Sequence, residues 1–232
     1  SKKVANNQNK KKILLVTSGS CGGSERVILT FARLFLEHNF IVKILIISIN
    51  GEKEIVNFIP MNIPYSIINV KRLRNSFFQI LKSVYIEKPH FTLSSISIIG
   101  IYLIISSFFY KKTKIIVRQG FMPAYNLDGN PWFIKFFYPF AFKIIAQTNE
   151  MKNEMITNYH LKSEKIMVVN NPIDKTYIDL KILDISPYTN VDSINWVAIG
   201  RIARIKDYLT LIKAFEIICK KNGNNNLYIL GA

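Results

Sequence analysis

The chain has 232 residues, 49% of them hydrophobic and 20% charged, so it can bury a sizeable core in one large domain or two small ones. Its net charge of +16 calls for an acidic partner or surface. Cys21 and Cys219 lack the spacing of a disulfide scaffold, which favours a reducing cytoplasm. No cluster of Cys, His and carboxylate residues has ligand spacing, so we expect no metal site.

The N-terminal part predicts the opening of a doubly wound parallel sheet. Residues 1–12 are polar and lysine-rich, and we expect them to be disordered and not a secretory signal. A buried strand is predicted over residues 13–17, a glycine-rich loop over 18–24, a helix from Glu25 to about Asn39, and a second strand over 41–49. The helix has Val27, Phe31, Leu34 and Phe35 on one face. In such sheets ligands bind at the carboxyl ends of the strands.

The glycine-rich loop fails both tests of a dinucleotide site. Counted from Gly19, the third and sixth positions hold Cys21 and Ser24, where glycines are required. The second strand ends without an acidic residue. We therefore expect neither a nicotinamide nor a flavin cofactor.

Two segments in the middle of the chain leave alternatives open. Residues 71–88 form a basic helical stripe that either covers the sheet or docks on anionic lipid. Residues 91–110 are uncharged and long enough for a membrane span, but their serines and their place in the chain favour a strand over 91–95 and a helix over 98–109.

The later strands bring polar residues to the same edge. A strand over residues 113–117 is followed by Arg118, which is suited to a phosphate or carboxylate, or is an ordinary surface arginine. The aromatic segment 131–140 favours a core or covering helix over a lipid contact. Strands are predicted at 143–146 and 166–169, with a helix capped by Thr148 between them and Asn171 after the second.

The end of the chain predicts a separate βαβ unit. A strand from Ile194 ends at a tight turn at Gly200, and a basic loop with Arg201 and Lys206 leads into a helix and a last apolar strand. The start of that helix would place backbone N–H groups and two cations around an anion. The alternative is a solvated basic loop beside a turn glycine.

This segment, Gly200-Arg201-Ile-x-x-x-Lys206-Asp207 followed by Leu227-Tyr-Ile-Leu-Gly231, resembles the donor-binding segment of family 4 retaining glycosyltransferases of GT-B fold. The likeness is close over residues 194–231 and looser from Ile13 onward. In that family the Arg and Lys hold the diphosphate of a nucleotide-sugar.

Two further segments fit the same family. Gly22-Gly23-Ser24-Glu25-Arg26 resembles the family's Gly-Gly-x-Glu-Arg opening, whose glycines let backbone approach sugar phosphate and acceptor; the alternative is a plain turn with Ser24 as the helix cap. Many members have a His where this chain has Arg118, so Arg118 and Asn171 are acceptor-side candidates only.

The resemblance implies a domain plan. The tail would span residues 1–12, an acceptor-side Rossmann-like domain 13–174, a linker 175–192, and the start of a nucleotide-sugar-binding domain 193–232. The family's Glu-x7-Glu segment does not occur in the chain, so we expect the second domain to be incomplete and full transferase activity to be lacking.

The resemblance also implies a function. We expect a peripheral enzyme on the cytoplasmic face of the membrane that moves a hexose or hexosamine from a UDP- or GDP-sugar to a lipid-linked or polysaccharide acceptor, as in lipopolysaccharide biosynthesis. Arg201 and Lys206 would stabilise the leaving diphosphate without a metal or cofactor, and the anomeric configuration would be retained. The alternatives are an inactive membrane-binding module and, on charge alone, a nucleic-acid binder, for which no recognition motif is present.

Overall fold

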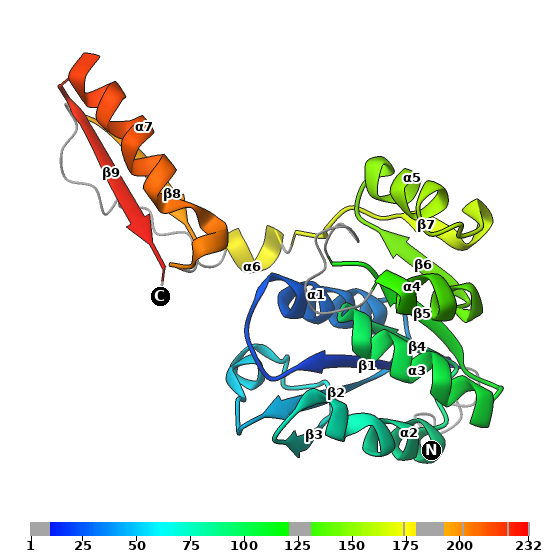
Figure 1. The fold of residues 1–232 in the computed structure, drawn as a ribbon. Coiled ribbons are helices and arrows are strands. Elements are labelled where there is room, and N and C mark those ends of the chain that lie inside the picture. Colours follow the sequence, from blue (N-terminus) through cyan, green and yellow to red (C-terminus); the bar gives the residue numbers. More distant parts are fainter. Residues whose placement is uncertain are drawn as a thin grey trace. The chain divides into compact units, whose positions relative to one another are not determined.

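A computed structural model describes residues 10–120, 131–173, 175–179, 193–200, 202–221 and 223–231 (Figure 1). The chain divides into two compact units, Ser1–Asp174 and Lys175–Ala232, which we call the N-terminal and C-terminal units.

The N-terminal unit is built on a seven-stranded sheet in which all strands run parallel. Its strands are β1 (Lys12–Ser18), β2 (Ile41–Ile49), β3 (Tyr65–Val70), β4 (Phe91–Ser94), β5 (Lys114–Arg118), β6 (Lys143–Ala146) and β7 (Ile166–Val168). Their order across the sheet is β3-β2-β1-β4-β5-β6-β7, so the direction of winding reverses between β1 and β4. The predicted doubly wound α/β fold is confirmed.

Helices cover both faces of this sheet. The α-helices are α1 (Gly23–Glu37), α2 (Phe77–Glu87), α3 (Ser97–Phe109), α4 (Pro131–Phe137) and α5 (Asn149–Thr157). The short 3-10 turns are η2 (Glu54–Phe58), η3 (Leu73–Ser76), η5 (Tyr138–Phe140) and η6 (Ser163–Lys165). Residues of α1 pack with one set of strand side chains, whereas residues of α2, α3, α4 and α5 pack with the other set.

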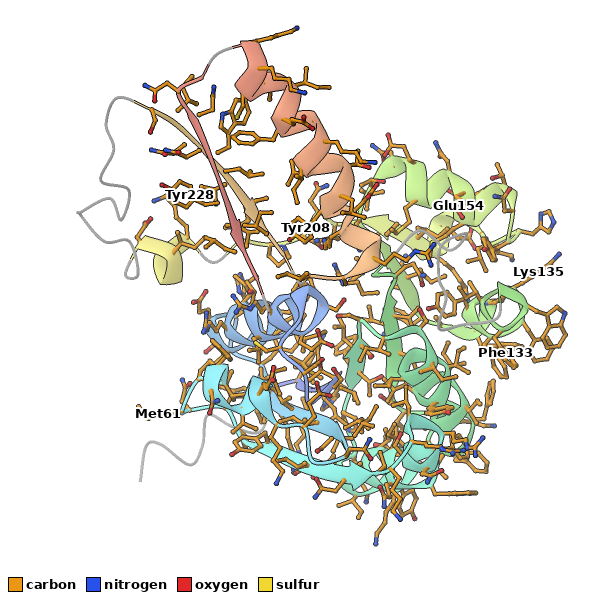
Figure 2. The ribbon with its side chains drawn as sticks, turned by 60° about the vertical axis from the view of Figure 1, so that its left-hand side comes forward. Met61, Phe133, Lys135, Glu154, Tyr208 and Tyr228 are labelled. Carbon is orange, nitrogen blue, oxygen red and sulfur yellow. The ribbon has the colours of Figure 1, made fainter. Side chains whose placement is uncertain are left out.

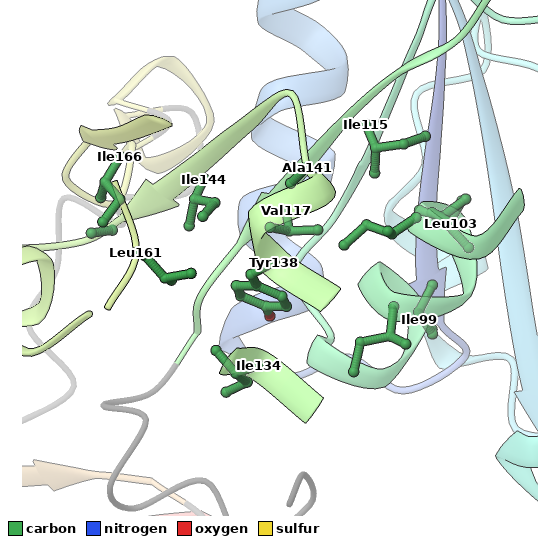
Figure 3. Packing of buried hydrophobic residues seen from close by; sticks show 14 of the residues in the cluster. Ile99, Leu103, Ile115, Val117, Ile134, Tyr138, Ala141, Ile144, Leu161 and Ile166 are labelled. Carbon is green, nitrogen blue, oxygen red and sulfur yellow. The ribbon is translucent and has the colours of Figure 1, made fainter. Parts of the chain in front are cut away.

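The alternation of strand side chains produces two core clusters. Leu14 and Val16 of β1 belong to the cluster under α2 to α5, while Ile13 and Leu15 belong to the cluster under α1. All four side chains are at most 2% exposed, as expected for a parallel sheet that is covered on both faces. Figure 3 shows the first cluster, where the Tyr138 ring lies among Ile134, Val117 and Ile144.

Several boundaries differ from the sequence predictions. The predicted helix over residues 71–88 is the turn η3 followed by α2, because Leu73–Ser76 adopts 3-10 geometry. Helix α1 begins two residues before Glu25, and Leu34, predicted on the same face as Val27, is 38% exposed whereas Val27 is buried. Residues 91–110 form β4 and α3, and within the described part of the chain no helix combines the length and apolarity needed to cross a membrane.

The predicted aromatic core segment is divided between core and surface. Ile134 and Tyr138 are buried and hold α4 and η5 against the sheet. Trp132, Phe136 and Phe140 are each more than half exposed, so the prediction of a covering helix is right for one side only.

The C-terminal unit contains two parallel strands and a helix. Its elements are α6 (Lys175–Asp179), β8 (Ile194–Ile199), η7 (Arg204–Lys206), α7 (Tyr208–Lys221) and β9 (Asn225–Leu230). Residues Ile194 to Ile199 pair in register with Asn225 to Leu230. The short helix α6 lies in the segment predicted as linker, and the described part of the unit contains no buried side chain.

Candidate functional site

The candidate site in the N-terminal unit lies at the carboxyl edge of the sheet, where the winding reverses. Open α/β sheets bind ligands at this position, because the loops from the two adjacent strands diverge there. The loop after β1 leads into α1, and the end of β4 lies next to it: the Ser95 hydroxyl donates to the Ser24 carbonyl at 3.4 Å. Two segments 71 residues apart thus form one rim of the site.

Close backbone contact explains the first glycine of the loop. A Cβ on Gly19 would lie 2.0 Å from the carbonyl oxygen of Glu52, a distance that no side chain tolerates. The Gly19 carbonyl also accepts a hydrogen bond from the Ile55 amide at 3.1 Å. Gly19 therefore fixes the path of the loop after β1 against the segment after β2.

The start of α1 differs from the expected capped turn. Gly22 is the N-cap residue and no side chain caps the helix, so the alternative prediction of Ser24 as the helix cap is wrong. The buried Glu25 carboxylate turns back and accepts from the Ser18 hydroxyl at 2.6 Å. A Cβ on Gly22 would lie 2.7 Å from the other Glu25 carboxylate oxygen, whereas one on Gly23 would meet nothing within 4 Å.

Arg118, at the end of β5, is a buried cation and not a surface arginine. It is 2% exposed, and its Nη2 donates to the Asn171 side-chain carbonyl, which follows β7. Its Nε and Nη1 atoms are buried and have no hydrogen-bond partner, and no carboxylate pairs with it among the described residues. Burial lowers the pKa of the guanidinium. Each unpaired buried donor costs about 1–3 kcal/mol, so this arrangement opposes folding unless something else binds there.

Gly120 connects Arg118 to the start of α1. A Cβ on Gly120 would lie 3.3 Å from the Ser24 hydroxyl oxygen and 3.8 Å from Arg118 Nη1. The guanidinium and the first turn of α1 therefore border the same small space. Of the site residues predicted in this unit, the structure brings Arg118 and Asn171 into contact and places Gly22 and Gly23 one to two residues from Ser24.

A hydrogen-bond network that the sequence analysis missed supports this edge. The buried Tyr138 hydroxyl donates to the Gln119 side-chain carbonyl at 3.0 Å. Gln147, after β6, donates from Nε2 to the main-chain carbonyls of Gln119 and Gly120 at 2.9 and 2.7 Å. The only sequence signal for this role was a tyrosine within an aromatic segment, and that pattern does not distinguish a buried hydroxyl from an exposed one.

The C-terminal unit presents a second βα turn with a basic side chain. A Cβ on Gly200 would lie 3.5 Å from Lys206 Cε and 3.1 Å from the Tyr208 hydroxyl oxygen, so both side chains lie against the turn. Tyr208, at the first turn of α7, donates its hydroxyl to the Gly200 carbonyl at 2.7 Å (Figure 2). Arg201 lies outside the described residues.

Asp207 occupies the N-terminus of α7. It has a left-handed backbone with φ of 47°, its carbonyl accepts from the Thr210 and Leu211 amides, and its carboxylate lies 3.4 Å from the Thr210 amide nitrogen. An acidic cap already offsets part of the positive helix end. An anion at this turn would thus depend more on Lys206 and its neighbours than on the helix itself.

Within the described residues no three His, Cys, Asp or Glu side chains gather in a group that could hold a metal ion. No protein-family model matches the chain, and no curated protein matches it in sequence.

Solved structures do match, over nearly the whole chain. A lipopolysaccharide outer core galactosyltransferase, WaaB, superposes with a TM-score of 0.64 and 15% identity, covering 95% of this chain and 68% of its own. Anabaena Alr3699/HepE, solved with UDP and glucose, has a TM-score of 0.68 and 14% identity over 95% of this chain and 61% of its own.

A third structure, described as a putative UDP-N-acetylglucosamine 2-epimerase from Listeria monocytogenes, has a TM-score of 0.62 and 13% identity over 96% of this chain and 62% of its own. The likeness at these identities is one of fold, and it is to the GT-B type that glycosyltransferases share with these epimerases. The chain spans about two thirds of the length of these proteins.

Proposed function

We propose that the protein is a glycosyltransferase that takes a hexose or hexosamine from a UDP- or GDP-sugar and transfers it to a lipid-linked or polysaccharide acceptor. The observation that carries this proposal is the position of Lys206 against Gly200 at the carboxyl end of β8. It is the position that the donor-binding segment of family 4 glycosyltransferases assigns to the lysine that holds the diphosphate. The fold likeness to Anabaena Alr3699/HepE, which was solved with UDP and glucose, supports the same interpretation.

The chemistry follows from the charges at this turn. When the bond between the sugar and the diphosphate breaks, negative charge grows on the leaving phosphate oxygen. Fixed cations stabilise that charge without reorganising, which lowers the barrier of the step. We assign this task to Lys206 and Arg201, with retention of the anomeric configuration as in family 4.

An exposed aromatic surface supports a membrane-associated acceptor. The rings of Trp132 and Phe136 are stacked, with their centroids 5.3 Å apart. The ring of Phe108 in α3 packs edge to face with that of Phe140 in η5, with centroids 5.4 Å apart. Beside α2 and α3, Phe78, Tyr85 and Phe109 line a groove of about 360 Å³ together with Lys82. Phe133 and Lys135 of α4 point away from the sheet (Figure 2). These helices all cover the same face of the sheet.

The mixture of exposed rings and lysines is the pattern that docks proteins on anionic bilayers, since rings enter the interface and each nearby Lys adds about 1 kcal/mol. We therefore place the enzyme at the inner face of the cell membrane. Sedimentation with anionic vesicles tests this: Trp132→Ala with Phe136→Ala should weaken binding about tenfold or more, and unchanged binding would contradict it.

The transfer reaction is tested with labelled UDP- and GDP-sugars and a lipid extract as acceptor. We expect label to move into the lipid fraction, at the reduced rate expected of a chain without the family's Glu-x7-Glu segment. Lys206→Ala should lower that rate about 100-fold, as for the loss of one preorganised donor to a developing oxyanion. The matched control is Arg204→Ala, which removes an exposed cation from the same loop. Equal rates for both variants, or an epimerised sugar in place of transferred label, would contradict the proposal.

A further inference from the structure

The N-terminal unit contains a buried positive charge that its described residues do not explain. Arg118 is held by one hydrogen bond to Asn171, and its Nε and Nη1 atoms are buried without a partner among those residues. Structural arginines in protein interiors are normally paired with a carboxylate or saturated by carbonyl groups. Arg118 has neither among the described residues, so two of its nitrogen atoms are left for a group that these residues do not supply.

A second source of positive potential lies beside it. Helix α1 is 15 residues long and begins at Gly22 without a side-chain cap, so the N–H groups of its first turn point outward. A Cβ on Gly120 would lie within 4 Å of both the Ser24 hydroxyl oxygen of this turn and Arg118 Nη1, so both atoms border Gly120. An uncapped helix start together with a guanidinium is a favourable setting for an anion.

The two sides of this helix start are not equivalent. On the Gly22 side, the Glu25 carboxylate already fills the space and is held by the Ser18 hydroxyl. On the Ser24 side the neighbours are the Gly120 backbone, the Ser95 carbonyl and the guanidinium. An anion would therefore be repelled from Gly22 and attracted to the space between Ser24 and Arg118.

We infer that Arg118, the Ser24 hydroxyl and the first turn of α1 form an anion pocket that takes a phosphate or carboxylate group of a substrate. A side chain at position 120 would crowd this space, because its Cβ would lie 3.3 Å from both the Ser24 hydroxyl oxygen and the Ser95 carbonyl oxygen. The pocket belongs to the N-terminal unit and is separate in sequence from the Gly200 turn. What supplies the anion rests on the proposed function: either a phosphate or carboxylate on the acceptor, or the diphosphate of the donor sugar.

The test is the thermal unfolding of the full chain in inorganic phosphate, with chloride added to hold the ionic strength constant. Wild type should be stabilised by phosphate in a saturable way. Arg118→Met removes the charge but keeps the length of the side chain, so it should lose about tenfold or more in phosphate affinity. Without phosphate it should be at least as stable as wild type, because the unpaired buried donors are gone.

Two control variants locate the effect. Arg72→Met removes an exposed cation of the same unit and should respond to phosphate as wild type does. Lys206→Ala removes the cation of the donor turn, so it should lose any phosphate bound there and keep the part of the response that depends on Arg118. Loss of the response in Lys206→Ala but not in Arg118→Met would overturn the pocket and leave the proposed function intact.

Two further results would also overturn it. An equal phosphate response in Arg118→Met and wild type would mean an adventitious ion only. A large loss of stability in Arg118→Met with an unchanged response would make Arg118 a structural residue. If Arg118→Met does not fold, the arginine Nε–H resonances of wild type decide: the solvent-protected one should shift on phosphate addition, and no shift contradicts the pocket.

Repeating the titration with UDP identifies the source of the anion. Suppose that Lys206→Ala loses the thermal stabilisation by UDP and Arg118→Met keeps it, while Arg118→Met loses the stabilisation by phosphate. The pocket then receives an anionic acceptor. If the stabilisation by UDP is lost in Arg118→Met, the pocket receives the donor diphosphate. The first pattern gives the substrate class directly: an acceptor that carries a phosphate or carboxylate.

Discussion

The two units of the chain differ in how completely they bury their apolar side chains. In the N-terminal unit, strand residues such as Leu15 and Ile44 are completely buried, and helices lie on both faces of the sheet. In the C-terminal unit, apolar side chains remain in water: Ile199 is 79% exposed and Leu209 74%. One helix on two strands buries too little apolar surface to offset the entropy of folding. The N-terminal unit thus holds its site by itself, whereas the C-terminal unit needs further apolar contacts to hold its own.

Hydrogen exchange should show the largest difference between the units. Amides in β1, β2 and β4 lie in the middle of a covered sheet and should exchange only on global unfolding. Amides in β8 and β9 should open locally, so we expect them to exchange about 1000-fold faster or more. Mass spectrometry after peptic digestion measures this, and similar protection in both sheets would show that the C-terminal unit is stable by its own contacts.

Substitution of Gly19 should strongly destabilise the N-terminal unit. Gly19→Ala forces a Cβ into the Glu52 carbonyl and should cost about 3 kcal/mol or more of unfolding free energy. Gly23→Ala, at the first residue of α1, meets open space and should cost nothing measurable. Denaturant titration gives both values, and equal effects of the two substitutions would show that the close approach at Gly19 is not rigid.

Tyr138 should give a smaller effect with a distinct pH dependence. Tyr138→Phe leaves the Gln119 carbonyl without its best donor and should cost about 1 kcal/mol. Burial raises the pKa of Tyr138 to about 12, from about 10 in the unfolded chain. The folded state therefore favours the neutral phenol, and wild-type stability should fall as the pH rises from about 10 to 12.

That alkaline loss should be shallower in Tyr138→Phe, since the variant lacks the group that titrates. Burial also raises the pKa of Tyr102 and Tyr159, so part of the loss remains in the variant. Identical slopes for wild type and variant would contradict the role given to the buried hydroxyl.

The fold could be predicted from the sequence because its strands are continuous apolar runs. Residues 41–49 and 143–146 were predicted with the bounds that the structure has, and Thr148 caps α5 as expected, its hydroxyl accepting from the Met151 amide at 3.2 Å. Helix starts were predicted less well. Glycines have low helix propensity, so Gly23 was assigned to the loop, although the buried Glu25 and its bond to Ser18 stabilise a helix start there.

The site could be predicted only in part. The sequence indicated which residues follow the strands, and Arg118 and Asn171 do meet, because the carboxyl ends of parallel strands share one edge. It could not indicate that Arg118 is buried with unpaired donors, since that depends on how Asn171 and Gly120 close around it. The roles of Gly22, Gly23, Gly200, Arg201 and Lys206 in binding phosphate remain predictions.

The central claim is that the turn at Gly200 binds the diphosphate of a nucleotide-sugar. It is tested most directly by the affinity of the full chain for UDP and GDP, measured by calorimetry for wild type, Lys206→Ala, Arg201→Ala and Arg204→Ala. We predict that one nucleotide binds, that Lys206→Ala and Arg201→Ala each weaken it about tenfold or more, and that Arg204→Ala changes it less than twofold. The same affinity in all four proteins, or no binding of either nucleotide, would contradict the account.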